Sequence, residues 1–176
     1  MNLFKQILLC GIVLIYANHA NSQDVDIRQI RIAGGNINFL INSYNKYENG
    51  ITYPINTRLS ITYRVDGSSG WELYAWTDQT EFISDTGEVL PLEALEIDFP
   101  LFTSTDDGSL NTDFKLFEET NKELLASGTG GDPNQVDIEL VVTYSIGKSP
   151  DEDYKLMNKV EGFYYLNIHF ELVKVE

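Results

Sequence analysis

Cysteine and histidine are nearly absent from this chain of 176 residues. Its only cysteine is Cys10, and its two histidines are His19 and His169. A lone cysteine cannot close a disulfide within the chain, so the fold must rely on packing. Beyond residue 22 there is no cysteine and one histidine. That scarcity excludes a Cys/His zinc site and a thiol nucleophile from that part of the protein.

Positive charge is scarce as well. The chain carries 12 Lys and Arg residues against 27 Asp and Glu residues, which gives a formal net charge of −15 at pH 7. A surface of this sign repels the phosphates of nucleic acids and the headgroups of anionic lipids. We therefore expect neither nucleic acid nor an acidic membrane surface among the partners.

Long apolar runs are also missing. The longest, residues 7–16, falls short of the roughly 20 residues that a membrane-spanning helix needs. Lys5 precedes this run and small or polar residues 17–22 follow it, a layout typical of a secretory signal peptide. We expect residues 1–22 to be removed on export. Residues 23–176 should then form one domain without a membrane span, in the periplasm, at the cell surface or outside the cell.

What the chain does contain is a strong two-residue alternation of apolar and polar side chains. Apolar residues occupy nearly every second position of 136–146, with Asp137 and Glu139 between them, and segments 59–65 and 164–172 repeat the pattern. Such alternation is typical of half-buried β-strands. Shorter candidate strands are 25–32, 36–41, 71–77, 95–99 and 124–127.

These strands are separated by turns rich in Gly, Asn and Asp, and no change in composition marks a second domain. About eight short strands with little helix predict an all-β, Ig-like two-sheet antiparallel sandwich, with an up-and-down β-barrel as the alternative. Residues 65–71 are expected to form a hairpin between two long strands. Residues 113–125 are expected to be a loop that enters a strand, although Phe114, Phe117 and Leu124 could instead line a short helix.

His169 is the first candidate for chemistry, because a Ser-His-Asp triad would have to use it. The alternation places it on the polar face of its strand, opposite Ile168 and Phe170, and the sequence has no G-x-S-x-G motif to supply a nucleophile. We therefore expect an exposed surface histidine and no catalytic residue. Nothing in the spacing of the many carboxylates selects a pair for glycoside hydrolysis.

Two acidic turns are candidates for a metal. Residues 105–113 gather oxygen ligands, and residues 150–153 contain three carboxylates. Calcium accepts six to eight oxygens from irregular loops, although neither segment has the EF-hand spacing. A solvated turn is the expected reading, with no cofactor. If a metal binds, the sequence favours calcium at these residues: Asp106, Asp107, Asn111 and Asp113.

Aromatic side chains on polar strand faces are candidates for ligand binding. If Trp71 and Leu73 point into the core, then Tyr74 and Trp76 stand on the outer face of the same strand. Phe163 and Tyr165 are likewise expected on the outer face of the last strand. Exposed rings beside carboxylates can stack on sugar rings, so these four residues predict a glycan-binding surface. The alternative is that they only pair across strands.

Three segments carry a family resemblance: residues 70–75 (GWELYA), 90–95 (LPLEAL) and 162–172 (GFYYLNIHFEL). Their order resembles that of exported bacterial β-sandwich proteins of the spore-coat-U and fimbrial-subunit-like type, over roughly residues 36–173. The resemblance implies an Ig-like sandwich with a structural role at the cell surface. It brings no catalytic residues, and this chain lacks the disulfide of many fimbrial subunits.

Together these features predict an exported, non-enzymatic surface, adhesive or assembly protein whose partners are other surface proteins or glycans. A carbohydrate-binding module is the first alternative, and a lipocalin-like binder of apolar ligands is the second.

Overall fold

The computed structural model describes residues 26–34, 37–53, 56–65, 69–130, 135–149 and 155–175. The predicted signal peptide, residues 1–22, and the acidic segment 150–153 lie outside the described residues. In the described part of the chain, each helix is too short or too polar to cross a bilayer.

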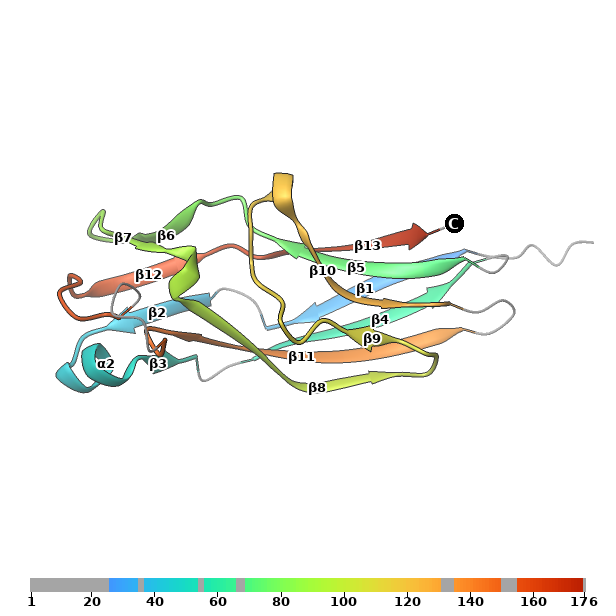
Figure 1. Ribbon diagram of the computed structural model, residues 1–176, viewed down its shortest axis with the longest axis horizontal. Helices are drawn as coiled ribbons and strands as arrows, with labels where there is room; N and C mark the ends of the chain where they lie inside the picture. The colour runs from blue at the N-terminus through green and yellow to red at the C-terminus, as the bar shows by residue number, and fades with distance from the viewer. Residues whose placement is uncertain are drawn as a thin grey trace, which may run out of the picture.

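Three antiparallel sheets make up the molecule (Figure 1). The first, called here the β11 sheet, consists of β1 (Ile27–Ala33), β3 (Ile51–Thr52), β4 (Thr57–Arg64), β8 (Leu95–Ser104) and β11 (Val136–Ile146). The second, the β5 sheet, consists of β5 (Gly70–Trp76), β9 (Ser109–Leu110), β10 (Glu123–Gly128) and β13 (His169–Val175). The third, the β12 sheet, consists of β2 (Ile37–Ile41), β6 (Glu81–Ser84), β7 (Val89–Pro91) and β12 (Gly162–Leu166). The short helices are α2 (Tyr44–Asn49), η1 (Leu92–Ala94) and η2 (Glu119–Asn121).

The sheets do not close into a barrel. The predicted all-β sandwich is therefore confirmed, although its strands form three sheets and not the two predicted, and the barrel alternative is wrong. Buried side chains of all three sheets meet in one apolar core, as the alternating burial along β4, β5 and β11 requires. The β12 sheet lies at one end of the molecule, where β12 leads almost in line into β13 (Figure 1).

The predicted hairpin at residues 65–71 is wrong. Both sides of β4 are occupied, by β1 and by β11, so β5 cannot pair with it. Instead β5 pairs with β10 and β13 in the β5 sheet. The Tyr63 hydroxyl donates a hydrogen bond to the Gly70 carbonyl at 2.8 Å and so links the end of β4 to the start of β5. A two-residue alternation identifies strands but does not say which sheet each one joins.

The region around residues 113–125 is a loop followed by a strand, as predicted. Phe114 and Leu116 are buried while Lys115 and Phe117 are exposed, so this stretch is extended before it enters η2 and β10. α2 and the short pair β6–β7 were not predicted, because they have too few residues to show a period.

The glycines at the loop positions offer a test of the fold. Gly50 ends α2 with φ of 69° and ψ of −173°, a region that residues with a Cβ avoid, and an added Cβ would lie 2.5 Å from the Ile146 carbonyl oxygen. Gly50→Ala should therefore destabilise the protein by about 3 kcal/mol in a urea titration. The control is Gly87→Ala, because Gly87 also has positive φ but an added Cβ there meets nothing within 4 Å. That variant should lose only about 1 kcal/mol, and equal losses would contradict the register of β3 against β11.

Candidate functional site

An open groove of about 880 Å³ lies beside β8. One wall is η1 and the first half of β8, and the other is residues 112–118. The chain runs through residues 112–118 from β9 toward η2 (Figure 1). Its apolar lining consists of these residues: Leu92, Leu95, Ile97, Phe114, Leu116 and Phe117. The volume lies in the range of ligand-binding clefts, 300 to about 1,000 Å³.

The second wall of the groove is held by a backbone hydrogen bond just beyond the end of β5 and by a ring contact with β8. The ring of Phe114 packs edge-on against Phe99, with ring centroids 6.3 Å apart. The backbone N–H of Thr77 donates to the Phe117 carbonyl at 2.9 Å. Among the described residues, no backbone hydrogen bond joins residues 112–118 to β8. The two walls thus touch at Phe99 and Phe114 but share no backbone hydrogen bond within the described residues.

The edge of β8 is open. β11 pairs with β8 on one side and with β4 and β3 on the other, and no described strand pairs with the far side of β8. Its register is broken once, where Phe99 and Pro100 lie opposite the single residue Val142. Residues 95–99 therefore form a short, separate stretch of unpaired strand edge that borders the groove.

The rim of the groove is acidic. Five carboxylates lie around it, with Lys115 as the one basic side chain among its lining residues: Glu93, Glu96, Asp98, Asp113 and Glu118. None of the five carboxylates forms an ion pair or accepts a hydrogen bond within the described residues. A ligand that enters the groove would meet uncompensated negative charge.

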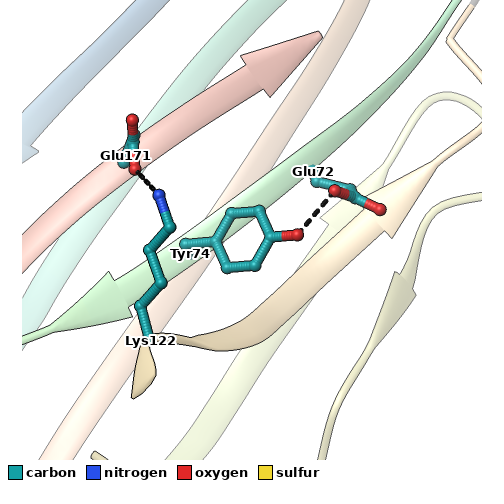
Figure 2. Close-up of polar contacts among 4 residues, drawn as sticks. All are labelled: Glu72, Tyr74, Lys122 and Glu171. Atoms are coloured by element: carbon teal, nitrogen blue, oxygen red, sulfur yellow. Dashed lines mark hydrogen bonds and ion pairs between the residues drawn. The ribbon is translucent and has the colours of Figure 1, made fainter. Parts of the chain in front are cut away.

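Tyr74 and Trp76 stand on the outer face of β5, as predicted, but both rings are already occupied. The Tyr74 hydroxyl donates to Glu72 at 2.7 Å, and the Lys122 ammonium lies 5.0 Å from the ring centroid while it pairs with Glu171 (Figure 2). The hydrogen bond to Glu72, followed by burial, raises the pKa of Tyr74. These contacts hold the Tyr74 ring within a network on the protein surface.

Trp76 is covered by His169. Their rings stack with centroids 4.2 Å apart and planes 14° apart, and the imidazole Nε2 lies 3.7 Å from an Asp78 carboxylate oxygen. His169 is on the outer face, as the alternation predicts, although it is half-buried and not fully exposed. In this arrangement the histidine shields an aromatic ring. No serine or threonine hydroxyl hydrogen-bonds to it within the described residues.

Phe163 and Tyr165 are the exposed pair, at 45% and 44% of their surface. Tyr165 lies opposite Ile83 of β6, and Ile83 lies opposite Val89 of β7, so the three side chains form one row across the outer face of the β12 sheet. The predicted set of four aromatic residues is thus divided. Two lie on the β12 sheet with free rings, and two lie on the β5 sheet with covered rings.

The acidic turn is organised around Asp106. Its carboxylate accepts hydrogen bonds from Ser104, from the Trp71 indole N–H at 2.9 Å, and from the backbone N–H groups of Gly108 and Gly130, each at 3.1 Å. Partial burial raises the pKa of Asp106, but these four hydrogen bonds outweigh it and leave the pKa below its usual value. Asp106 therefore holds the β8–β9 turn against the β5 sheet.

The other predicted calcium ligands do not converge on Asp106. The Asn111 amide donates to Glu123 at 3.2 Å and to the Leu124 carbonyl at 3.1 Å, and its oxygen accepts from the Asp113 N–H. Asp107 is exposed. Within the ranges that the structure covers, no three His, Cys, Asp or Glu side chains gather as a metal site would require. Calcium binding stays a prediction without a built site.

The interior between the two layers is tightly filled. A hollow lined by Ala75, Val142 and Phe170 measures about 10 Å³, room for about one water molecule. Tyr144 borders the same hollow, and burial raises its pKa to about 12. This space is too small for a ligand of the lipocalin type.

The groove was not predicted from the sequence. Apolar and polar residues alternate at residues 95–99 and 114–117, which predicts a strand and a loop but does not show that the two segments face each other. Comparison with known proteins adds no further identification, because no protein-family model, curated protein or solved structure matches this chain.

The role of Asp106 can be tested against pH. Because its pKa is lowered by folding, its contribution to stability is present above the unfolded value near 3.9 and is lost as pH falls through the lower folded value. Asp106→Asn should cost about 2 kcal/mol at pH 7, with a smaller difference from wild type near pH 3. The exposed Asp107→Asn is the control and should change stability by less than about 0.5 kcal/mol. A loss that needs added calcium, or equal losses in both variants, would contradict this assignment.

Proposed function

We propose that this protein is an exported, non-enzymatic surface or assembly component that binds an extended segment of a partner protein along the edge of β8. The observation that carries the proposal is the unpaired edge of residues 95–99 beside an apolar groove. An exposed strand edge is a template for another strand, which brings affinity through backbone hydrogen bonds and specificity through alternate side chains.

The side chains of β8 are arranged for this mode of binding. Leu95 and Ile97 share the inner face with their partners on β11, while Glu96 and Asp98 share the outer face. A strand added beside β8 would place every second side chain against Leu95 and Ile97 and into the groove. Backbone pairing and apolar burial account for the binding, and no chemical step is required.

A carbohydrate-binding surface is a second candidate, supported by the two free rings of Phe163 and Tyr165. They are two residues apart on one strand face, and the exposed Asn38 lies opposite Tyr165 on β2. This candidate uses only half of the predicted aromatic set. The lipocalin-like alternative has no support from the filled interior.

The groove can be tested with a photoreactive amino acid in the cell that makes the protein. Placed at Phe117, which is exposed on the groove wall, it should crosslink to a protein at the cell surface. The control position is Tyr44 on α2, which is more exposed but does not line the groove, and the crosslinked fraction there should be lower. Equal crosslinking at both positions, or no protein adduct at position 117, would refute the proposal.

The glycan candidate has its own test on a glycan array. Tyr165→Ala should lower binding about tenfold, the loss of one stacking contact worth about 1.4 kcal/mol. Trp76→Ala is the comparison, since His169 covers that ring and the loss should be smaller. If the wild-type protein binds no glycan, or if Trp76→Ala loses more than Tyr165→Ala, this second candidate is rejected.

A further inference from the structure

All four arginines of the chain lie on two neighbouring strands. Arg28 and Arg31 are exposed on β1, and Arg58 and Arg64 are on β4, its partner in the β11 sheet. β8 contains no basic residue, and the groove beside it is rimmed by carboxylates. The β11 sheet therefore has a cationic side and an anionic side.

β1, with its arginines, and β8, with its carboxylates, are the two edge strands of the β11 sheet. Its order is β1, β4, β11 and β8, so β1 ends one side and β8 the other. Three antiparallel pairings separate the two edges, so β1 and β8 run in opposite directions. A second copy that is translated along the sheet would present its β1 antiparallel to the β8 of the first copy. The twist of the sheet would rotate each copy relative to the one before it without changing these strand directions.

The side chains of the two edges match on both faces. Ile30 and Ile32 of β1 lie on the inner face of the sheet, as Leu95 and Ile97 of β8 do. Ile32 is 51% exposed although its partner across the ladder, Leu59, is fully buried, so the core is uncovered at this edge. A neighbouring strand would remove Ile32 from water.

The charged side chains follow the same division. Arg31 lies on the outer face of β1, the face that carries Glu96 and Asp98 on β8. Arg28 lies on the inner face, the side on which the groove is rimmed by Asp113 and Glu118. Opposite charges would thus meet on each face when β1 is placed beside β8.

Charged residues on an edge strand often serve only to prevent aggregation. Here they would prevent two of the three possible pairings between copies. β1 against β1 would oppose arginines, and β8 against β8 would oppose carboxylates, whereas β1 against β8 brings opposite charges together. The pattern disfavours the pairing of either edge with itself and favours the head-to-tail contact.

We propose that the occupant of the β8 edge is β1 of a second copy of this chain, paired antiparallel with residues 95–99, so that copies join head to tail. This inference rests on the proposed function and names the partner. A head-to-tail contact that does not close on itself produces an open filament. Each junction would extend the β11 sheet from one molecule into the next.

The test uses two charge-reversed variants of the purified protein. One is Arg28→Glu with Arg31→Glu, and the other is Glu96→Lys with Asp98→Lys; circular dichroism and thermal unfolding verify that each is folded. Sedimentation of the wild type should show a concentration-dependent series of oligomers, and each variant alone should sediment as a monomer. A 1:1 mixture of the two variants should restore the series, because the reversed β1 of one then meets the reversed β8 of the other. Glu48→Lys with Glu88→Lys, exposed and away from both edges, is the charge-matched control and should behave as wild type.

The outcomes separate this inference from the proposed function. Oligomers that survive both reversals, a mixture that stays monomeric, or a wild type that is monomeric at all concentrations would each overturn the head-to-tail contact. In those cases a crosslink from Phe117 to a different protein would still support the β8 edge as a binding site. Loss of that crosslink as well would remove both proposals.

Discussion

An open sheet must end in two strands whose backbone groups have no strand partner, and this constraint governs the surface of the protein. In the β11 sheet these edge strands are β1 and β8, and their side chains carry opposite charges. β1 carries exposed arginines, while β8 carries carboxylates and borders an apolar groove. These two edges are the places where another strand can bind, because hydrogen-bonding groups left unpaired at an edge are available to it.

The remaining polar features serve the fold. Asp106 uses both carboxylate oxygens to fasten the β8–β9 turn to Trp71 of the opposite layer. Tyr74 and Trp76 are stabilised by a lysine and a histidine that cover their rings. In a domain without disulfides, such contacts between elements add to the apolar core and fix the positions of the edges. The same residues are therefore poor choices for a ligand site.

The sequence was sufficient for the strands whose side chains alternate over many positions. β4, β5 and β11 each bury one face completely, so their period of two was visible in the sequence. The same period in β12 predicted that Phe163 and Tyr165 lie on its outer face. The sheet to which a strand belongs could not be read in this way. Both edges of β4 are filled by strands distant in sequence, which is why β4 and β5 do not form a hairpin.

The candidate site was harder to predict for a similar reason. The groove arises because residues 112–118 are hydrogen-bonded to Thr77 and touch β8 at Phe99 without pairing with its backbone, an arrangement that depends on contacts between distant segments. The arginines and carboxylates were visible in the sequence as an overall charge. Their separation onto opposite edges depends on the strand order, which local patterns do not contain.

Pro100 sets a limit on any strand that β8 receives. It has no N–H to donate, and with Phe99 it bulges opposite Val142, so the regular stretch of edge ends after five residues. A seam this short holds few backbone hydrogen bonds, each of which contributes only about 1 kcal/mol net. Bonds of that kind break and re-form readily, and an assembly built from them would be renewable, held together by a high local concentration of copies more than by the strength of any single junction.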